Sequence, residues 1–188
     1  MSNEVEQIFK DAGAMLEGHF LLTSGLHSPI YWEKFRVLQY PQYTEKLCRL
    51  IAERFKNDKV QVVVGPTTGG IIIAFEVARQ LGVKSIFAEK EGKERVFQRG
   101  FVINSGERVL IVDDILTTGG SIIEVIDTVN RSGGNIIGAG VLVDRAEQDI
   151  ELGVPLFSCL RSVALTYTPA DCPLCAAGVP LVRHGKQT

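Results

Sequence analysis

Residues 109–121, VLIVDDILTTGGS, contain the side-chain types that could bind a phosphorylated sugar. A hydrophobic run leads into two carboxylates, Asp113 and Asp114, and a loop rich in threonine and glycine follows. An ionised carboxylate only accepts hydrogen bonds, so the pair suits the donor hydroxyls of a ribose, or a magnesium ion that offsets phosphate charge. Free backbone N–H groups in such a loop bind phosphate. Together these chemistries indicate a ribose phosphate as ligand.

The residues around this stretch predict a strand, a polar loop and a helix. The run at residues 109–112 is typical of a strand buried on both faces that ends at the acidic pair. The apolar periodicity of residues 122–129 predicts a helix. The loop would then lie at the carboxyl end of a sheet strand, where first-turn N–H groups face a ligand. An ordinary strand and capped helix is the alternative, because Asp and Thr are common turn and cap residues.

Residues 60–82 repeat this plan, with a strand at residues 60–64, the loop GPTTGG and a helix that ends at Gly82. Two such units predict a parallel sheet with crossover helices. The GPTTGG loop could present N–H groups to a second phosphate. The chain has neither a P-loop nor a dinucleotide-binding fingerprint, which removes the main support for those two classes.

Several further elements are expected from periodicity and turn residues. They are a lid or cap helix at residues 3–12 with a possible Ser2 or Asn3 cap, a hairpin at 19–35, a core helix at 41–56, a buried strand at 135–143 and an edge strand at 158–168. The buried strand ends at Asp144 and Arg145, where a guanidinium could grip a substrate carboxylate or carbonyl. A structural Asp144–Arg145 interaction is the alternative.

The hairpin at residues 19–35 has residues that suit a site for a planar base. Ser24 offers a hydroxyl, Gly25 allows close backbone approach, and Tyr31 and Trp32 offer flat surfaces. The alternative is a surface hairpin with its aromatic side chains in the core. His27 alone indicates no more than a turn residue.

Residues 89–100, EKEGKERVFQRG, form a charged, glycine-containing connection between strands expected at residues 84–88 and 96–102. It contains Lys90, Lys93, Arg95 and Arg99. Such a polar segment cannot be buried, so it is expected to be mobile. It could be a lid that brings positive charge to a leaving diphosphate, because stabilising developing charge is often the largest catalytic contribution. A solvated hairpin tip is the alternative.

Composition limits the classes of function. The chain has 188 residues, 45% hydrophobic residues and a net charge of −2, which fits one globular domain and argues against nucleic acid as the main partner. No apolar stretch approaches the length of a membrane span, and the polar start is no secretory signal, so a cytoplasmic protein is expected. The four cysteines are too few and too unevenly spread for a secreted disulfide framework.

The tail contains a C-x-x-C pair, Cys172 and Cys175. A structural zinc site needs four ligands, and His184 and the distant Cys159 are the candidates for the other two. A C-terminal turn without metal is therefore the favoured interpretation.

The motifs together resemble those of the type I phosphoribosyltransferases. Four segments carry the resemblance: TSGLHSPIYW, VVVGPTTGGIIIAFEVARQLG, VDDILTTGGS and VLVDRAE. The third is similar to the signature for phosphoribosyl diphosphate (PRPP), and the first and last are similar to those of the members that use orotate. The resemblance implies an α/β fold with a central, mostly parallel sheet flanked by helices. It also implies one domain with a small N-terminal hood at residues 1–40, a core at 41–168 and a tail at 169–188.

The resemblance and the residue chemistry assign roles at the site. The expected catalytic residues are Lys90, Lys93, Arg95 and Asp114. The expected PRPP-binding residues are Lys90, Asp113, Asp114, Ile115, Leu116, Thr117, Thr118, Gly119, Gly120 and Ser121. The expected orotate-binding residues are Ser24, Gly25, Thr117 and Arg145. The resemblance further implies Mg²⁺, held mainly by PRPP and water, and a homodimer.

Three positions depart from the pattern of many family members. Thr23, Glu89 and Arg95 stand where a lysine, an arginine and a histidine are common, and Lys34, Arg95 or Arg99 could supply the missing charge. Two other functions stay open: transfer to a purine or uracil base, and a regulator that binds PRPP without turnover. A cationic lid argues against the regulator, because binding alone needs none.

Overall fold

The computed structural model describes residues 2–22, 24–163 and 165–183, and the side chains from Glu4 onward within these ranges. Its helices are α1 (Ser2–Asp11), α2 (Lys34–Leu38), α3 (Pro41–Phe55), α4 (Gly69–Leu81), α5 (Gly120–Arg131) and α6 (Pro173–Ala176). Its strands are β1 (Met15–Leu21), β2 (His27–Trp32), β3 (Val62–Pro66), β4 (Lys84–Glu91), β5 (Glu94–Val96), β6 (Arg108–Leu116), β7 (Asn135–Asp144) and β8 (Leu156–Arg161).

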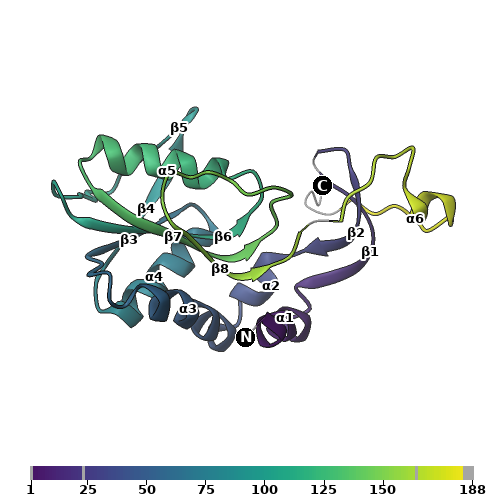
Figure 1. Ribbon diagram of the computed structural model, residues 1–188, viewed down its shortest axis with the longest axis horizontal. Helices are drawn as coiled ribbons and strands as arrows, with labels where there is room; N and C mark the ends of the chain where they lie inside the picture. The colour runs from purple at the N-terminus through teal and green to yellow at the C-terminus, as the bar shows by residue number, and fades with distance from the viewer. Residues whose placement is uncertain (1, 23, 164, 184–188) are drawn as a thin grey trace.

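The main sheet has the strand order β5-β4-β3-β6-β7-β8. Its neighbouring strands are parallel except for the antiparallel pair β4 and β5. Figure 1 shows α3 and α4 on one face of this sheet and α5 on the other. The predicted α/β fold with a mostly parallel sheet is therefore confirmed.

Helices cover both faces of the sheet. Successive side chains on a strand point to opposite faces, so the side chains of each central strand are buried on both sides. Val63 packs with the α3 and α4 side chains Ile51 and Ile73, whereas its neighbours Val62 and Val64 pack into the cluster around α5. Strands buried in this way need hydrophobic residues at every position, which explains the continuous runs in the sequence.

Helix ends agree with local signals in the sequence. Pro41 occupies the first turn of α3, where its missing N–H is not needed. Helix α4 ends at Gly82, which adopts the left-handed conformation with φ of 69° that favours glycine. The predicted core helix and the predicted helix end are both confirmed.

The hairpin of β1 and β2 forms a separate antiparallel sheet beside the main body (Figure 1). Phe9 of α1 packs edge-on against Trp32 of β2, with 5.0 Å between ring centroids, and both side chains are buried. The expected lid or cap helix is therefore a packed part of the core. The expected hairpin is confirmed, and Trp32 follows the alternative in which an aromatic side chain fills the core.

Several strand boundaries differ from those expected; for example, β3 spans Val62–Pro66 instead of residues 60–64, and β4 continues past residue 88 to Glu91. Strand β6 continues through the acidic pair to Leu116 because it stays paired with β7 as far as Asp144. Strand β5 is confined to Glu94–Val96 instead of residues 96–102, since it pairs only with the end of β4. Strand β8 ends at Arg161 and does not reach residue 168.

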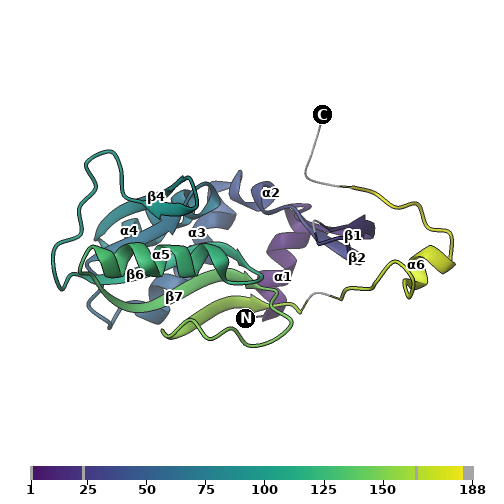
Figure 2. The ribbon, with the colours of Figure 1, turned by 90° about the horizontal axis from the view of Figure 1, so that it is seen from above.

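After β8 the chain leaves the main sheet and runs beside the β1–β2 hairpin, and α6 lies at the far end of this segment (Figure 2). None of the described helices is long and apolar enough to span a membrane. We refer to residues 165–183 as the tail.

Gly140 on β7 should be intolerant of a side chain. A Cβ there would lie 2.7 Å from Cγ2 of Ile51 on α3, closer than real contacts allow. We expect Gly140→Ala to lower the free energy of unfolding by about 1–3 kcal/mol, the usual cost of overpacking. Urea unfolding would measure this. If the overlap is the cause, the same substitution should cost less in an Ile51→Ala background, and equal costs in both backgrounds would contradict it.

Candidate active site

The site lies at the topological switch point of the main sheet, between β3 and β6. Strand β3 pairs with β4 on one side and with β6 on the other. Helix α4 follows β3 on one face of the sheet, and α5 follows β6 on the opposite face (Figure 1). The loops after β3 and β6 therefore start side by side at the carboxyl edge and lead to opposite faces of the sheet. Open α/β sheets bind their ligands at such a switch point.

The acidic pair lies within β6 and is largely buried. Asp113 is 7% exposed and Asp114 is 3% exposed. Because neighbouring strand residues face opposite sides of the sheet, the two carboxylates diverge. The Asp114 carboxylate is paired with Lys34 at the start of α2, with Nζ 2.8 and 2.9 Å from its two oxygens. Each carboxylate also accepts the N–H of the next residue.

Burial and, to a lesser extent, the charge of Asp114 raise the pKa of Asp113 to about 7, although the hydrogen bond from the Asp114 N–H and the charges of Lys34 and Arg95 lower it. A buried charge is costly unless another group compensates it. Asp113 is therefore an acceptor whose ionisation depends on its surroundings, as is common at functional sites.

The loop after β6 is open to solvent, in contrast to the acids. Thr117, Thr118, Gly120 and Ser121 are exposed. Gly119 has a φ of 78°, which favours glycine and turns the chain into α5. Asp113 and residues 115–122 line a hollow at this point. The first-turn N–H groups of α5 have no partner within the helix, so the hollow can hold an anion.

The GPTTGG loop after β3 packs against the acidic pair. A side chain on Gly69 would overlap the Asp114 carboxylate, and one on Gly65 would overlap the carbonyl of Gly70. Thr67 and Thr68 are joined by a cis peptide bond. The glycines therefore allow the loop to lie directly beside Asp114, which places the two predicted loops in one site.

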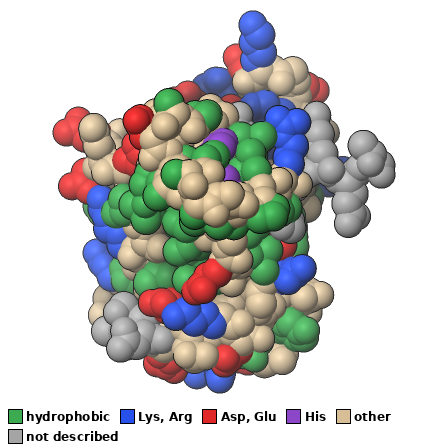
Figure 3. Space-filling view, turned by 90° about the vertical axis from the view of Figure 1, so that its right-hand side faces the viewer, with side chains coloured by type: hydrophobic (Ala, Val, Ile, Leu, Met, Phe, Trp, Pro, Cys, Tyr) green, Lys and Arg blue, Asp and Glu red, His purple; other side chains and the backbone are tan. Residues whose placement is uncertain are grey.

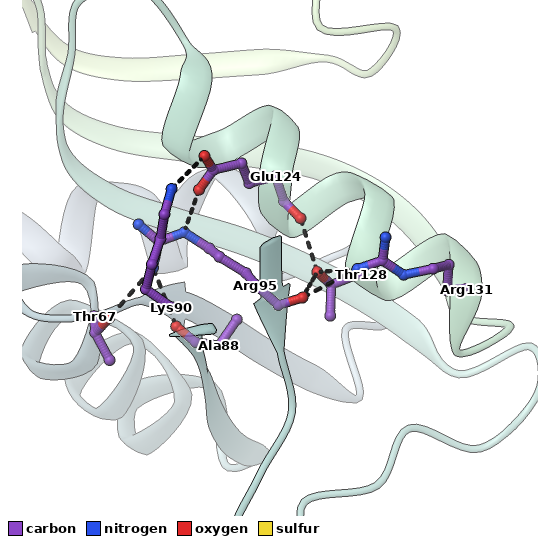
Figure 4. Close-up of polar contacts among 7 residues, drawn as sticks. All are labelled: Thr67, Ala88, Lys90, Arg95, Glu124, Thr128 and Arg131. Carbon is purple, nitrogen blue, oxygen red and sulfur yellow. Dashed lines mark hydrogen bonds and ion pairs between the residues drawn. The ribbon is translucent and has the colours of Figure 1, made fainter. Parts of the chain in front are cut away.

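The charged connection is a tight hairpin that contacts α5. Strands β4 and β5 pair as far as Glu91 and Glu94, so the first part of the connection is a hairpin with a short turn, as in the alternative interpretation. Glu124 of α5 binds two of its cations (Figure 4). Its carboxylate lies 2.7 Å from Nζ of Lys90 and 3.0 Å from Nε of Arg95.

Arg95 is 7% exposed, so it is not a solvated lid residue. Its guanidinium also donates to the hydroxyl of Thr67 and the carbonyl of Ala88, each at 3.3 Å (Figure 4). Arg95 therefore connects the charged hairpin to the GPTTGG loop. Arg99 instead pairs with Glu89 at 2.8 Å. Lys93 lies at the exposed turn, and no ion pair involves it among the described residues.

Arg145 follows β7 at the same edge of the sheet. Its Nε is buried and has no hydrogen-bond partner within the described residues. Burial lowers the pKa of Arg145, and Tyr31 of the β1–β2 hairpin raises it. The neighbouring Asp144 does not bind Arg145. It accepts hydrogen bonds from the N–H of Ala146 and from Arg161, so the alternative Asp144–Arg145 interaction is wrong.

Ser24 and Gly25 lie in the turn between β1 and β2. Their described hydrogen bonds stay within that turn, where Leu26 donates to the Ser24 hydroxyl and Gly25 donates to Leu22. The structure thus brings Tyr31, rather than the turn, close to Arg145. Thr23 lies outside the described residues.

Two residues of the site were not expected in these positions. Lys34 was considered only as a spare cation, and it pairs with Asp114. Glu124 was not singled out, and it holds Lys90 and Arg95. A glutamate near the start of a helix is common, so no local signal in the sequence distinguishes it.

The residues present do not form a cage for Mg²⁺. Asp114 is already paired with Lys34, and Asp113 is buried on the other face of β6. Magnesium prefers several oxygen ligands and retains water, so a diphosphate would have to supply most of its coordination here.

Comparison with known proteins agrees with this geometry. The family model for the phosphoribosyl transferase domain matches residues 36–161, which include β3, β6, β7 and the helices between them. The chain therefore belongs to the phosphoribosyltransferase family. The predicted family and fold are confirmed.

Relatives that match over nearly the whole chain show which members of the family this chain is similar to. The chain is 50% identical over 185 residues to the orotate phosphoribosyltransferase of Pelotomaculum thermopropionicum, covering 98% of this chain and 97% of the relative. It is 50% identical to that of Desulforamulus reducens, covering 98% and 96%. The crystal structure of orotate phosphoribosyltransferase from Aeropyrum pernix matches with a TM-score of 0.72 and 31% identity, over 84% of this chain and 93% of that one.

The buried charge of Asp113 predicts a specific dependence of stability on pH. Because its folded pKa of about 7 exceeds the ordinary value of 3.8, the folded protein binds more protons between these values, and stability falls as the pH rises through them. Asp113→Asn should remove this slope and stabilise the protein above pH 7 by on the order of 1–3 kcal/mol. Urea unfolding of both proteins at several pH values would measure it. Parallel stability profiles would contradict the assignment.

Proposed function

We propose that this chain transfers the phosphoribosyl group of PRPP to orotate, which gives orotidine 5′-phosphate and diphosphate in pyrimidine nucleotide synthesis. The observation that carries the proposal is that three features lie at one sheet edge: the acidic pair, the open Thr117–Ser121 loop, and Arg145, whose buried Nε has no hydrogen-bond partner among the described residues. The first two suit a ribose phosphate, and the third suits an anionic acceptor.

In this proposal the loop after β6 binds the 5-phosphate. Thr117, Thr118 and Ser121 offer hydroxyls, and the start of α5 offers N–H groups and the positive end of its dipole. Asp113 and Asp114 accept hydrogen bonds from the ribose hydroxyls. Lys34 lowers the pKa of Asp113 and pairs with the Asp114 carboxylate, which it holds in place. Ile115 and Leu116 contribute backbone as the strand enters the loop.

The leaving diphosphate acquires charge as the bond at C1 breaks. We assign its stabilisation to Lys90, Lys93 and Arg95, because preorganised cations favour a transition state in which charge grows. Arg95 is held against the GPTTGG loop, so it lies where a diphosphate beside that loop would be. For Lys90 to reach the ligand, it must exchange its contact with Glu124 for one with a phosphate oxygen.

Orotate needs little base chemistry, because its ring nitrogen is readily deprotonated. The protein then has mainly to align that nitrogen with C1 and to exclude other orientations. Arg145 can donate to a carboxylate or carbonyl of the base through its unused Nε, with Tyr31 beside it. Thr117 completes this end of the site, and the Ser24–Gly25 turn is proposed to reach it when the base is bound.

Three finer features belong to the proposal. Mg²⁺ would arrive on the diphosphate of PRPP, where it would offset negative charge. A homodimer is supported by the exposed side chains of Phe35, Tyr40, Ile72 and Phe75 around the contacting helices α2 and α4, since exposed apolar groups often mark interfaces. A cytoplasmic location fits a metabolic enzyme with these substrates.

The choice of base can be tested directly. Purified protein mixed with PRPP, Mg²⁺ and orotate should consume orotate, which the loss of its absorbance would measure, and should not consume adenine or uracil. Arg145→Ala should raise KM for orotate by roughly tenfold or more, because a charged hydrogen bond contributes about 1.5–3 kcal/mol. Consumption of another base, unaffected by Arg145→Ala, would point to a different phosphoribosyltransferase. Binding of PRPP without turnover of any base would indicate a regulator.

Lys93→Ala tests the charged hairpin. We expect turnover to fall by roughly a hundredfold or more with little change in PRPP affinity, because an interaction made mainly in the transition state affects kcat rather than binding. Steady-state kinetics and PRPP titration would measure the two quantities. Lys46→Ala, at an exposed position on α3, is the matched control and should change neither. Equal losses of turnover and affinity in the Lys93 variant would mean that the hairpin only binds.

A further inference from the structure

Four side chains that the proposed reaction does not use converge between the β1–β2 hairpin and the tail. They are His19 of β1, His27 of β2, and Cys172 and Cys175 around α6, and one nitrogen or sulfur atom from each lies within 4.8 Å of all the others. Figure 3 shows histidine side chains (purple) in a small opening among hydrophobic side chains at this end of the molecule. His19, His27 and Cys172 are buried and Cys175 is exposed.

Four of the six separations between these atoms are close to those around one tetrahedral ion, and all six are within 4.8 Å. With Zn–N near 2.0–2.1 Å and Zn–S near 2.3 Å, tetrahedral nitrogen and sulfur ligands should lie about 3.5 Å apart. Nε2 of His19 lies 3.5 Å from Sγ of Cys172 and 3.7 Å from Sγ of Cys175, and Nδ1 of His27 lies 3.3 Å from Sγ of Cys175. The two nitrogens are 2.9 Å apart, against about 3.3 Å for the same geometry.

The orientation of His19 fits a metal ligand. Its other ring nitrogen, Nδ1, lies 2.8 Å from the carbonyl oxygen of Val179. A carbonyl only accepts, so Nδ1 carries the hydrogen, and the neutral ring then presents a lone pair at Nε2 toward the two sulfurs. Metal-binding histidines are commonly fixed by a hydrogen bond of this kind.

The tail has little else to hold it. From Pro173 to Arg183 every residue except Leu174 is exposed, so few apolar contacts form there. Its other links to the hairpin include backbone hydrogen bonds, between Val182 and the strand residues His19 and Leu21 and between Tyr167 and His27, and the hydrogen bond from the Ser28 hydroxyl to the carbonyl of Leu165. Segments that bury so little surface are commonly stabilised by a metal or disulfides.

We propose that His19, His27, Cys172 and Cys175 form a structural zinc site that joins the tail to the hairpin. The four protein ligands complete a tetrahedron, which leaves no position for a substrate. The site is therefore structural and distinct from the candidate active site around Asp113 and Asp114. On binding, the two thiols release their protons to solvent and coordinate Zn²⁺ as thiolates, without any change of oxidation state.

This site corrects the sequence-based interpretation of the tail. The C-x-x-C pair is not an unpartnered turn, and its neighbours are His19 and His27 rather than Cys159. Cys159 instead contacts the carbonyl of Leu47 on α3. His184 lies outside the described residues.

Elemental analysis of the full chain, purified after removal of any affinity tag, tests the proposal. We expect about one zinc ion per chain, and none in a Cys172→Ser, Cys175→Ser double variant. Cys159→Ser is the control, because it removes a thiol outside the cluster and should retain the metal. Zinc in the double variant at the level of the parent would overturn the proposal.

Two measurements on the parent protein avoid dependence on how the variants fold. A chelator should lower the melting temperature, and added Zn²⁺ should restore it. Replacement by Co²⁺ should give the visible absorption of a tetrahedral thiolate complex, which Cys175→Ser alone should alter. Metal-free protein with an unchanged melting temperature in added Zn²⁺ would reject the site, as would a Cys172–Cys175 disulfide in protein purified under reducing conditions.

Discussion

The position of β3 between β4 and β6 is the constraint on which the site depends. Because β3 and β6 are parallel neighbours, the loops that follow them start at the same carboxyl edge, and α4 and α5 then cover opposite faces of the sheet. The GPTTGG loop and the Thr117–Ser121 loop are thereby brought together although they are some fifty residues apart in the chain. Strand pairing, rather than any single side chain, places these loops together.

Charged side chains of both signs lie close together at this edge of the sheet. Two adjacent carboxylates are buried at the end of β6, with Lys34 and Arg95 acting on them from α2 and β5. Glu124 in turn forms ion pairs with both Lys90 and Arg95. A phosphorylated ligand would therefore compete with Glu124 for the cations. Arg95 is thus held against the GPTTGG loop before substrate binds, whereas Lys90 must leave Glu124 to reach a phosphate.

Much of this organisation could be predicted from the sequence, because it depends on local patterns. Hydrophobic runs identified β3 and β6, and glycines identified the loops and the end of α4. What could not be predicted depends on tertiary partners. The extension of β6 to Leu116 follows from pairing with β7, and the burial of Arg95 follows from contacts with Thr67 and Glu124.

The cluster of His19, His27, Cys172 and Cys175 shows the same limit. Its members are separated by up to 156 residues, and no spacing rule connects a hairpin to a tail over that distance. The C-x-x-C pair was visible in the sequence, but its partners were not. From the hairpin sequence, His27 indicated no more than a turn residue, and His19 was not singled out.

The most direct test of the central claim is a crystal structure of the protein with bound ribose 5-phosphate. The phosphate should lie against the N–H groups that begin α5, between Thr117 and Ser121, with the ribose hydroxyls facing the acids of β6. A phosphate held elsewhere, with the hollow after β6 empty, would contradict the account.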